Sequence, residues 1–270
     1  MNFIITQNGV LNHLEKNILQ DQSNNHTIYE VIRVMNGTSL FLEDHFDRLQ
    51  TSVQIRGLQL KMELLEFRHN IAELTKLNGQ QNGNVKFTLS KVGKENQWTF
   101  SFIPSSYPTA SDYQLGVATG LLFAERENPN AKVIQHIVRE GANQLMADKK
   151  LYEVLLVDHN GMITEGSRSN VFFVKKNLFF TAPASKVLVG VTRKKVMECL
   201  NELNFRVIEQ AVATFETGAF DAVFLTGTSP KVLPVNSIDS ILFSPNNSLV
   251  EQLMERYDSM IAAYLKTSKA

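Results

Sequence analysis

The chain has little of several features that mark particular classes of protein. It holds one cysteine, Cys199, so no internal disulfide can form, and we expect a reducing compartment. Eighteen apolar residues never occur together, and residues 1–8 lack the basic start and apolar run of a secretory signal. Basic and acidic residues number 27 each, so no charge excess recruits nucleic acid or a membrane surface. We therefore expect a cytoplasmic protein whose partners are small molecules.

The composition and pattern predict a soluble α/β protein with two domains. Hydrophobic residues make up 43% of the 270 residues and charged residues 20%, which is ordinary for a globular chain. We expect a small α/β domain over residues 1–115, a linker over 116–130, and a larger domain over 131–270 that contains antiparallel strands. The linker is suggested by a polar stretch at residues 125–130.

Alternating and helical periodicities give the expected elements of both domains. The first domain is expected to contain strands at residues 29–35, 39–42, 85–91 and 97–103, with helices at 42–57 and 62–77. A strand near residues 117–123 falls inside the expected linker. The second is expected to contain a helix at 134–150, an antiparallel meander from 152 to 181, helices at 192–203 and 249–265, and strands at 205–209 and 222–226.

One acidic residue interrupts an apolar strand pattern in the second domain. Glu165 lies in the stretch from Thr164 to Phe173, and a carboxylate at the end of such a strand needs a cationic or protonated partner. One interpretation is an exposed glutamate in a hairpin. The other is a carboxylate that faces a ring nitrogen and favours its protonated form, which turns a pyridine ring into an electron sink.

Two short segments have the character of backbone cradles for an anion. Residues 190–193 pass from a loop into a helix, where unpaired N–H groups point along the positive end of the helix dipole. Residues 226–230 form a small polar turn after a buried strand. An alternative for Thr192 is an ordinary helix N-cap. Lys132 lies upstream of both segments, and with Glu165 these residues suggest a pyridoxal phosphate enzyme.

The chain resembles the class IV aminotransferase family along nearly its whole length. The resemblance rests on ordered blocks at residues 29–33, 45–49, 132, 152–157, 164–173, 190–193 and 225–229, with Pro234-Val235. It implies the fold-type IV architecture, pyridoxal 5'-phosphate as cofactor in a crevice between the halves, and a homodimer. It implies no metal site.

The resemblance also assigns roles to individual residues. Lys132 stands at the Schiff-base lysine, which also moves the proton, and is preferred to Lys149 and Lys150 at the exposed end of a helix. Glu165 stands at the partner of the pyridine nitrogen. The implied phosphate contacts are Arg48, Val191, Thr192, Gly227 and Thr228. The implied substrate contacts are Tyr29, Lys91 and Ser229, where Lys91 replaces the arginine by which D-amino acid aminotransferases hold a carboxylate.

The activity that the resemblance implies is amine transfer from an amino acid to a 2-oxo acid. An apolar, branched-chain amino acid is the preferred substrate class, and aminodeoxychorismate lyase, which releases pyruvate, is the alternative. Gln135 stands where the family has asparagine, and residues 21–26 replace a glycine-rich block, which keeps the lyase open. Two other classes also remain: a module that binds a phosphorylated ligand without turnover, and a structural interaction domain.

Overall fold

The chain packs as two compact units in a computed structural model that describes residues 3–12, 27–93 and 95–268. The first unit comprises Met1–Ser106, Ala131–Ile134 and Ile261–Ala270, and the second comprises Tyr107–Asn130 and Gln135–Met260. The domain boundaries expected from the sequence stay predictions. The expected mixed α/β class is confirmed, because each unit is built on a sheet with packed helices. In the described part of the chain, every helix is too short or too polar to cross a bilayer.

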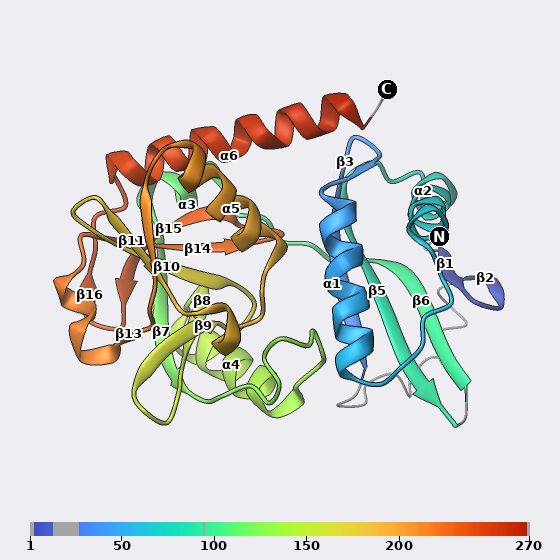
Figure 1. Ribbon diagram of the computed structural model, residues 1–270, viewed down its shortest axis with the longest axis horizontal. Helices are drawn as coiled ribbons and strands as arrows, with labels where there is room; N and C mark the ends of the chain where they lie inside the picture. Colours follow the sequence, from blue (N-terminus) through green and yellow to red (C-terminus); the bar gives the residue numbers. More distant parts are fainter. Residues whose placement is uncertain (1–2, 13–26, 94, 269–270) are drawn as a thin grey trace. The chain divides into compact units, whose positions relative to one another are not determined.

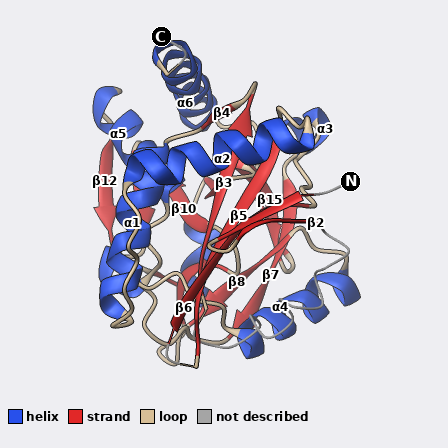
Figure 2. Cartoon of the chain, turned by 90° about the vertical axis from the view of Figure 1, so that its right-hand side faces the viewer, coloured by secondary structure: helices blue, strands red, loops and turns tan. Residues whose placement is uncertain are grey.

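The first unit is an antiparallel sheet covered on one face by two helices (Figure 2). The sheet has the order β2-β1-β6-β5-β3-β4. Its strands are β1 (Phe3–Thr6), β2 (Gly9–Asn12), β3 (Ile28–Met35), β4 (Thr38–Ser39), β5 (Gly83–Val92) and β6 (Glu95–Ile103). The helices are α1 (Leu42–Ile55) and α2 (Leu64–Asn78).

Apolar side chains from the sheet and both helices form the core of the first unit. Phe67 of α2 packs against Phe46 of α1 and against Phe87 and Phe100 of the sheet, with ring centroids 4.9–5.4 Å apart. The Asn36-Gly37 turn, with positive φ at both residues, joins β3 to β4 as the sequence predicted. The expected strand over residues 39–42 is wrong beyond Ser39, because Leu42 already begins α1.

The second unit is a mixed ten-stranded sheet with helices (Figure 1). Its ordered path is β12-β11-β10-β14-β15-β7-β8-β9-β13, with β16 paired to β15. The strands are β7 (Val117–Phe123), β8 (Glu153–Val157), β9 (Met162–Gly166), β10 (Asn170–Lys175), β11 (Leu178–Thr181), β12 (Arg206–Glu209), β13 (Val212–Ala213), β14 (Ala222–Gly227), β15 (Lys231–Ile238) and β16 (Ile241–Leu242). The helices are α3 (Ala110–Leu115), α4 (His136–Lys149), α5 (Val191–Glu202) and α6 (Ser248–Thr267), and the residues of α6 from Ile261 onward belong to the first unit. Two 3-10 turns are η3 (Ala184–Lys186) and η4 (Thr214–Ala219).

The strand pairing corrects the expected meander. β7 pairs in parallel with β8 and β15, and β11 pairs in parallel with β12. β9 pairs with β8 and β13, whereas β10 pairs with β11 and β14, so the chain changes neighbours at the turn after Gly166. Alternation within a single strand predicts which face is buried but not which strand lies beside it. The turn that follows Glu165 therefore joins two strands, β9 and β10, that are not paired with each other.

The stretch expected to be a linker contains regular structure. Thr109 caps α3 through a reciprocal capping box with Asp112, in which the Thr109 hydroxyl accepts from the Asp112 N–H at 3.2 Å. β7 lies inside the sheet, between β15 and β8, and α4 packs along β7 and β8 (Figure 1). A short apolar run such as residues 117–123 therefore marked an interior strand.

Candidate active site

A buried carboxylate on β3, that of Glu30, contacts two side chains of α1 in the first unit. Glu30 accepts hydrogen bonds from Arg48 Nε at 2.8 Å and Arg48 Nη2 at 2.6 Å, and its Oε2 lies 2.9 Å from His45 Nδ1. Burial alone would raise the pKa of Glu30, but the charge of Arg48 and the hydrogen bonds from His45 and Arg48 lower it to about 2. Glu30 is therefore a permanent anion that fixes the orientation of Arg48.

His45 is held in the same cluster on α1. Burial lowers the pKa of His45, and the positive charges of Arg48 and Lys132 lower it further against the opposing effect of Glu30. The imidazole is consequently neutral at physiological pH. Because its Nδ1 faces an ionised carboxylate, we assign the ring proton to Nδ1, which donates to Glu30.

Lys132 enters the first unit on a short segment that pairs with β3. Its carbonyl accepts from the Tyr29 N–H at 3.0 Å, and its own N–H donates to Ser52 Oγ on α1 at 3.1 Å. The neighbouring Val133 forms an isolated bridge with Ile28. The backbone of Lys132 is thus fixed between sheet and helix.

The side chain of Lys132 lies over an aromatic ring. Its Nζ is 4.6 Å from the centroid of Tyr29, so the predicted catalytic lysine and a predicted substrate contact come together. Arg48 lies one turn before Ser52 on α1, and its carbonyl oxygen accepts a hydrogen bond from the Ser52 hydroxyl at 3.0 Å. One helix therefore carries Arg48 and also supports the Lys132 backbone.

Glu165 is a buried residue at the end of β9 in the second unit. Its Oε1 lies 3.0 Å from Arg126 Nε, and its Oε2 accepts from the Leu188 N–H at 3.2 Å. Arg126 also donates from Nη2 to the Ser167 carbonyl at 2.5 Å. The Nε–H of Arg126 is close to Glu165 but not aligned for a hydrogen bond, so we treat that contact as an ion pair. The hairpin-surface interpretation of Glu165 is wrong.

A second buried carboxylate holds the turn that follows Glu165. Glu153 on β8 accepts from Ser167 Oγ at 2.6 Å, from Ser169 Oγ at 2.9 Å and from the Arg168 N–H at 3.1 Å. Gly166 is required here, because an added Cβ would lie 2.1 Å from Ser169 Oγ. The turn is thus fixed by Glu153 on one strand.

The two anion cradles are formed by small residues. Gly190 is the N-cap of α5 and has no side-chain capping bond, so the alternative of Thr192 as N-cap is wrong. Val191 and Thr192 are buried in the first turn of α5. An added Cβ on Gly190 would lie 2.3 Å from Asn170 Oδ1, so the backbone passes close to β10 at this point. These first-turn N–H groups suit an anion.

The turn after β14 offers further polar groups. Thr226 is buried, and its hydroxyl has no hydrogen-bond partner among the residues that the structure describes. Gly227 follows, where an added Cβ would come within 3.0 Å of Pro230. Thr228 and Ser229 complete the turn and are half-buried. A buried hydroxyl without a partner is costly unless a ligand supplies one.

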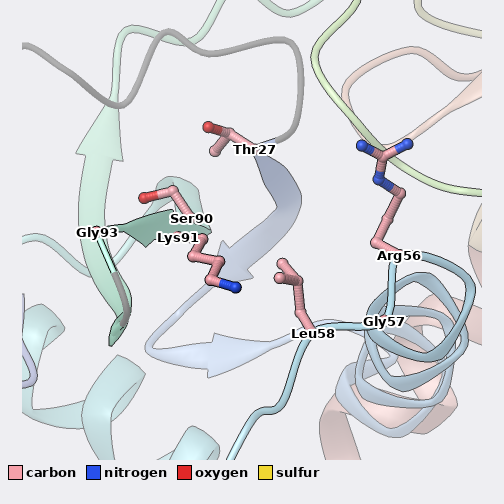
Figure 3. A pocket seen from close by; sticks show the side chains of 7 residues that line it. All are labelled: Thr27, Arg56, Gly57, Leu58, Ser90, Lys91 and Gly93. Atoms are coloured by element: carbon pink, nitrogen blue, oxygen red, sulfur yellow. The ribbon is translucent and has the colours of Figure 1, made fainter.

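Lys91 lies apart from Tyr29, beside a cavity of about 340 Å³ in the first unit (Figure 3). Lys91 follows Ser90 on β5, so its side chain leaves the opposite face of the strand. Tyr29 is paired with Thr88, and both project from one face of the sheet. Ser90 shares that face because it lies two residues after Thr88, so Lys91 projects from the other face. The cavity is lined by Thr27, Arg56, Gly57, Leu58, Ser90, Lys91 and Gly93.

Three charged residues that contact or orient the predicted site residues were not predicted from the sequence, namely Glu30, Arg126 and Glu153. Glu30 is the polar residue on the buried face of β3, between Ile28 and Ile32, and Glu153 opens the apolar strand β8. Both give the same signal that singled out Glu165, namely an acid within an apolar strand pattern. Arg126 gave no comparable signal, because it lies in a polar stretch. The block at residues 21–26 lies outside the described residues.

Each unit by itself holds charged and polar residues that suit an enzyme acting on a small anionic molecule. The chain belongs to the class IV aminotransferase family, because the family model for amino-transferase class IV matches residues 27–238. The resemblance stated from the sequence is thereby confirmed. D-alanine aminotransferase from Bacillus licheniformis is 28% identical over 226 residues, covering 78% of each chain.

Solved structures of related proteins show the same fold. A branched-chain aminotransferase from Thermoproteus uzoniensis, with norvaline, has a TM-score of 0.85 at 19% identity and covers 99% of this chain and 97% of its own. A protein assigned as a 4-amino-4-deoxychorismate lyase from Legionella pneumophila has a TM-score of 0.80 at 19% identity and covers 92% and 94%. The likeness to both confirms the expected architecture.

The residues present fit pyridoxal 5'-phosphate, the cofactor of this family. The first turn of α5 and the partnerless Thr226 hydroxyl offer donors to a phosphate. Glu165 is a carboxylate whose two oxygens are held by Arg126 and by a backbone N–H. In Arg48, by contrast, Nε and Nη2 are already engaged by Glu30. The two contacts with Glu30 therefore compete with the phosphate contact expected of Arg48.

Proposed function

We propose that this chain is a pyridoxal phosphate-dependent aminotransferase that moves an amine between an amino acid and a 2-oxo acid. The observation that carries the proposal is the Lys132 amine, held over Tyr29 by a backbone that is hydrogen-bonded to β3 and α1. When bound, the cofactor supplies an aldehyde that takes up an amine and a ring that withdraws electrons. Lys132 holds the cofactor and moves the proton.

Each other predicted residue has a proposed role in this site. Glu165 holds a proton at the ring nitrogen, and its charge is supported by Arg126 at 3.0 Å. Thr192 and Val191 offer N–H groups of α5 to the phosphate, and Gly227 and Thr228 offer the turn after β14. Arg48 contributes positive charge. Substrate contacts are proposed for Tyr29 and Ser229, whereas Lys91 projects from the other face of the sheet from Tyr29.

The proposed substrate class is an apolar or branched-chain amino acid. Support comes from the branched-chain aminotransferase among the solved structures, although the D-alanine enzyme is the more similar in sequence. The replacement of arginine by lysine at position 91 argues against D-amino acids. The lyase stays a second candidate, because a protein assigned to that activity shares the fold. We further propose a cytoplasmic homodimer, as the family resemblance implies.

A spectrum and a donor panel test this proposal. Purified protein incubated with pyridoxal phosphate should show a visible absorption band that borohydride abolishes, and peptide mass spectrometry should locate the reduced adduct on Lys132. The Lys132→Ala variant should lose the adduct and the activity, whereas Lys149→Ala, on the exposed end of α4, should keep both. Amine transfer from branched-chain amino acids to 2-oxoglutarate should follow.

The outcomes distinguish the candidates. An adduct on another residue would refute the role of Lys132. Pyruvate release from aminodeoxychorismate without any amine acceptor would replace the aminotransferase by the lyase. Tight binding of pyridoxal phosphate without turnover of any donor would favour a binding module, and the absence of binding would favour a structural domain.

A further inference from the structure

A second lysine shares the face of the sheet that carries Tyr29. β3 and β5 pair with Tyr29 opposite Thr88 and Val31 opposite Lys86. Directly opposed residues of an antiparallel pair project from the same face, so these four side chains form one surface. Glu30 projects from the other face, toward His45 and Arg48. Lys86 therefore belongs to the Lys132 side of the sheet.

Lys86 and Lys132 approach the same aromatic ring. Lys86 Nζ lies 5.7 Å from the Tyr29 centroid, and Lys132 Nζ lies 4.6 Å from it. The two nitrogens are thus within about 10 Å of each other, close to the distance over which salt screens charges. Two ammonium groups beside one aromatic ring give this surface a positive charge, which attracts an anion.

The chemistry of this surface fits a carboxylic acid with an apolar side chain. Tyr29 and Val31 supply aromatic and aliphatic contacts, and the Thr88 hydroxyl is hydrogen-bonded to Thr99 Oγ1 at 2.7 Å. Lys91, on the opposite face of β5, cannot share this surface by the alternation of the strand.

We propose that Lys86 binds the carboxylate of the amino acid or 2-oxo acid and thereby selects acids over amines that lack a carboxylate. This inference rests on the proposed function, since Lys132 marks where the reacting amine lies. Lys86 is half-buried, so its charge is less screened than that of an exposed lysine. A single ammonium can donate to one carboxylate without the planar fork of an arginine.

The test compares Lys86→Met with Lys86→Arg in the holoenzyme. Loss of a charge-assisted hydrogen bond should raise KM for the amino acid by about 10- to 100-fold, with kcat changed only a few-fold. KM for a primary amine without a carboxylate should stay unchanged. Lys86→Arg should restore most of the acid affinity. The matched control is Lys61→Met, an exposed lysine between α1 and α2, which should behave as wild type.

A binding measurement tests Lys86 independently of turnover. Calorimetry should measure the binding of 3-methylbutanoate, an acid without an amine or oxo group. Lys86→Met should bind this acid at least about 10-fold more weakly than wild type, and its affinity should depend less on salt concentration. Equal binding to wild type and Lys86→Met would overturn the inference, as would an equal rise in KM for acid and amine. If wild type bound 3-methylbutanoate through Lys86 yet transferred no amine, the proposed function would fail and the acid site would stand.

Discussion

The Glu30 cluster allows one prediction to be worked out in magnitude. Glu30→Gln removes a carboxylate whose pKa is lowered from 4.5 to about 2. At 1.36 kcal/mol for each pKa unit, that depression corresponds to about 3 kcal/mol of unfolding free energy. The substitution also leaves Arg48, 11% exposed, without its anionic partner. We expect Glu30→Gln to lower the unfolding free energy by about 3–5 kcal/mol at pH 7.

The pH dependence has a definite sign. A carboxylate with a lowered folded pKa contributes stability above its unfolded value, and this contribution is lost as pH falls. The Glu30 contribution should therefore disappear between about pH 5 and pH 2. His45 also has a lowered pKa, so its loss begins at higher pH, near its ordinary value of 6.5. The contribution of Glu30 to the unfolding free energy should therefore be measured below pH 5.

Urea unfolding followed by tryptophan fluorescence is the appropriate assay. The chain has a single tryptophan, Trp98, and it packs against Phe100 in the same unit as Glu30, with ring centroids 5.6 Å apart. The matched control is Glu43→Gln, which breaks the exposed Arg68–Glu43 ion pair. Because both of its side chains are more than 40% exposed, the control should lose less than about 1 kcal/mol.

Two results would refute this reasoning. One is that Glu30→Gln and Glu43→Gln have the same unfolding free energy at pH 7. The other is that the difference in unfolding free energy between wild type and Glu30→Gln stays the same down to pH 2.5. The first would mean that Glu30 is not the anion that holds Arg48. The second would mean that the cost arises from packing and not from charge.

Three further changes have expected outcomes. Glu153→Gln should weaken pyridoxal phosphate binding about 10-fold in a fluorescence titration, because an amide nitrogen cannot accept from the Ser169 hydroxyl; unchanged affinity would contradict this. Gly190→Ala should lower the unfolding free energy by about 1–3 kcal/mol in thermal unfolding, since its Cβ would lie 2.3 Å from Asn170 Oδ1, and a neutral effect would show that β10 gives way. Burial raises the pKa of Cys199 to about 11, so a disulfide reagent at pH 8 should react slowly with native protein and quickly in urea.

The sequence was sufficient for the elements with strong periodicity. Helices α1, α2, α4, α5 and α6 begin and end within a few residues of their expected bounds. In α1, α2, α5 and α6 a stripe of buried apolar residues defines the helix, whereas Ala142 is the one buried residue of α4. Lys132 and Tyr29 were expected at one site, and the structure places them together. Such features follow from short stretches of chain and from a family pattern.

Features that depend on long-range pairing were not predictable in the same way. The parallel pairing of β7 with β8 and the separation of β9 from β10 depend on which strands become neighbours, which alternation does not encode. The contacts of Glu30 with Arg48 join different elements of the first unit. An acid on a buried strand face indicates that it has a partner, but the sequence does not show which residue that partner is.

The composition of the first unit has a consequence for synthesis on the ribosome. Its sheet is complete by residue 103, yet Lys132 and Val133 still have to hydrogen-bond to β3, and the Tyr264 hydroxyl donates to Glu43 at 2.7 Å. Because chains emerge from the ribosome from the N-terminal end, the strands of this sheet are made before the segments that supply these contacts. The segment that carries Lys132 is thus added to a sheet whose strands all precede it in the chain.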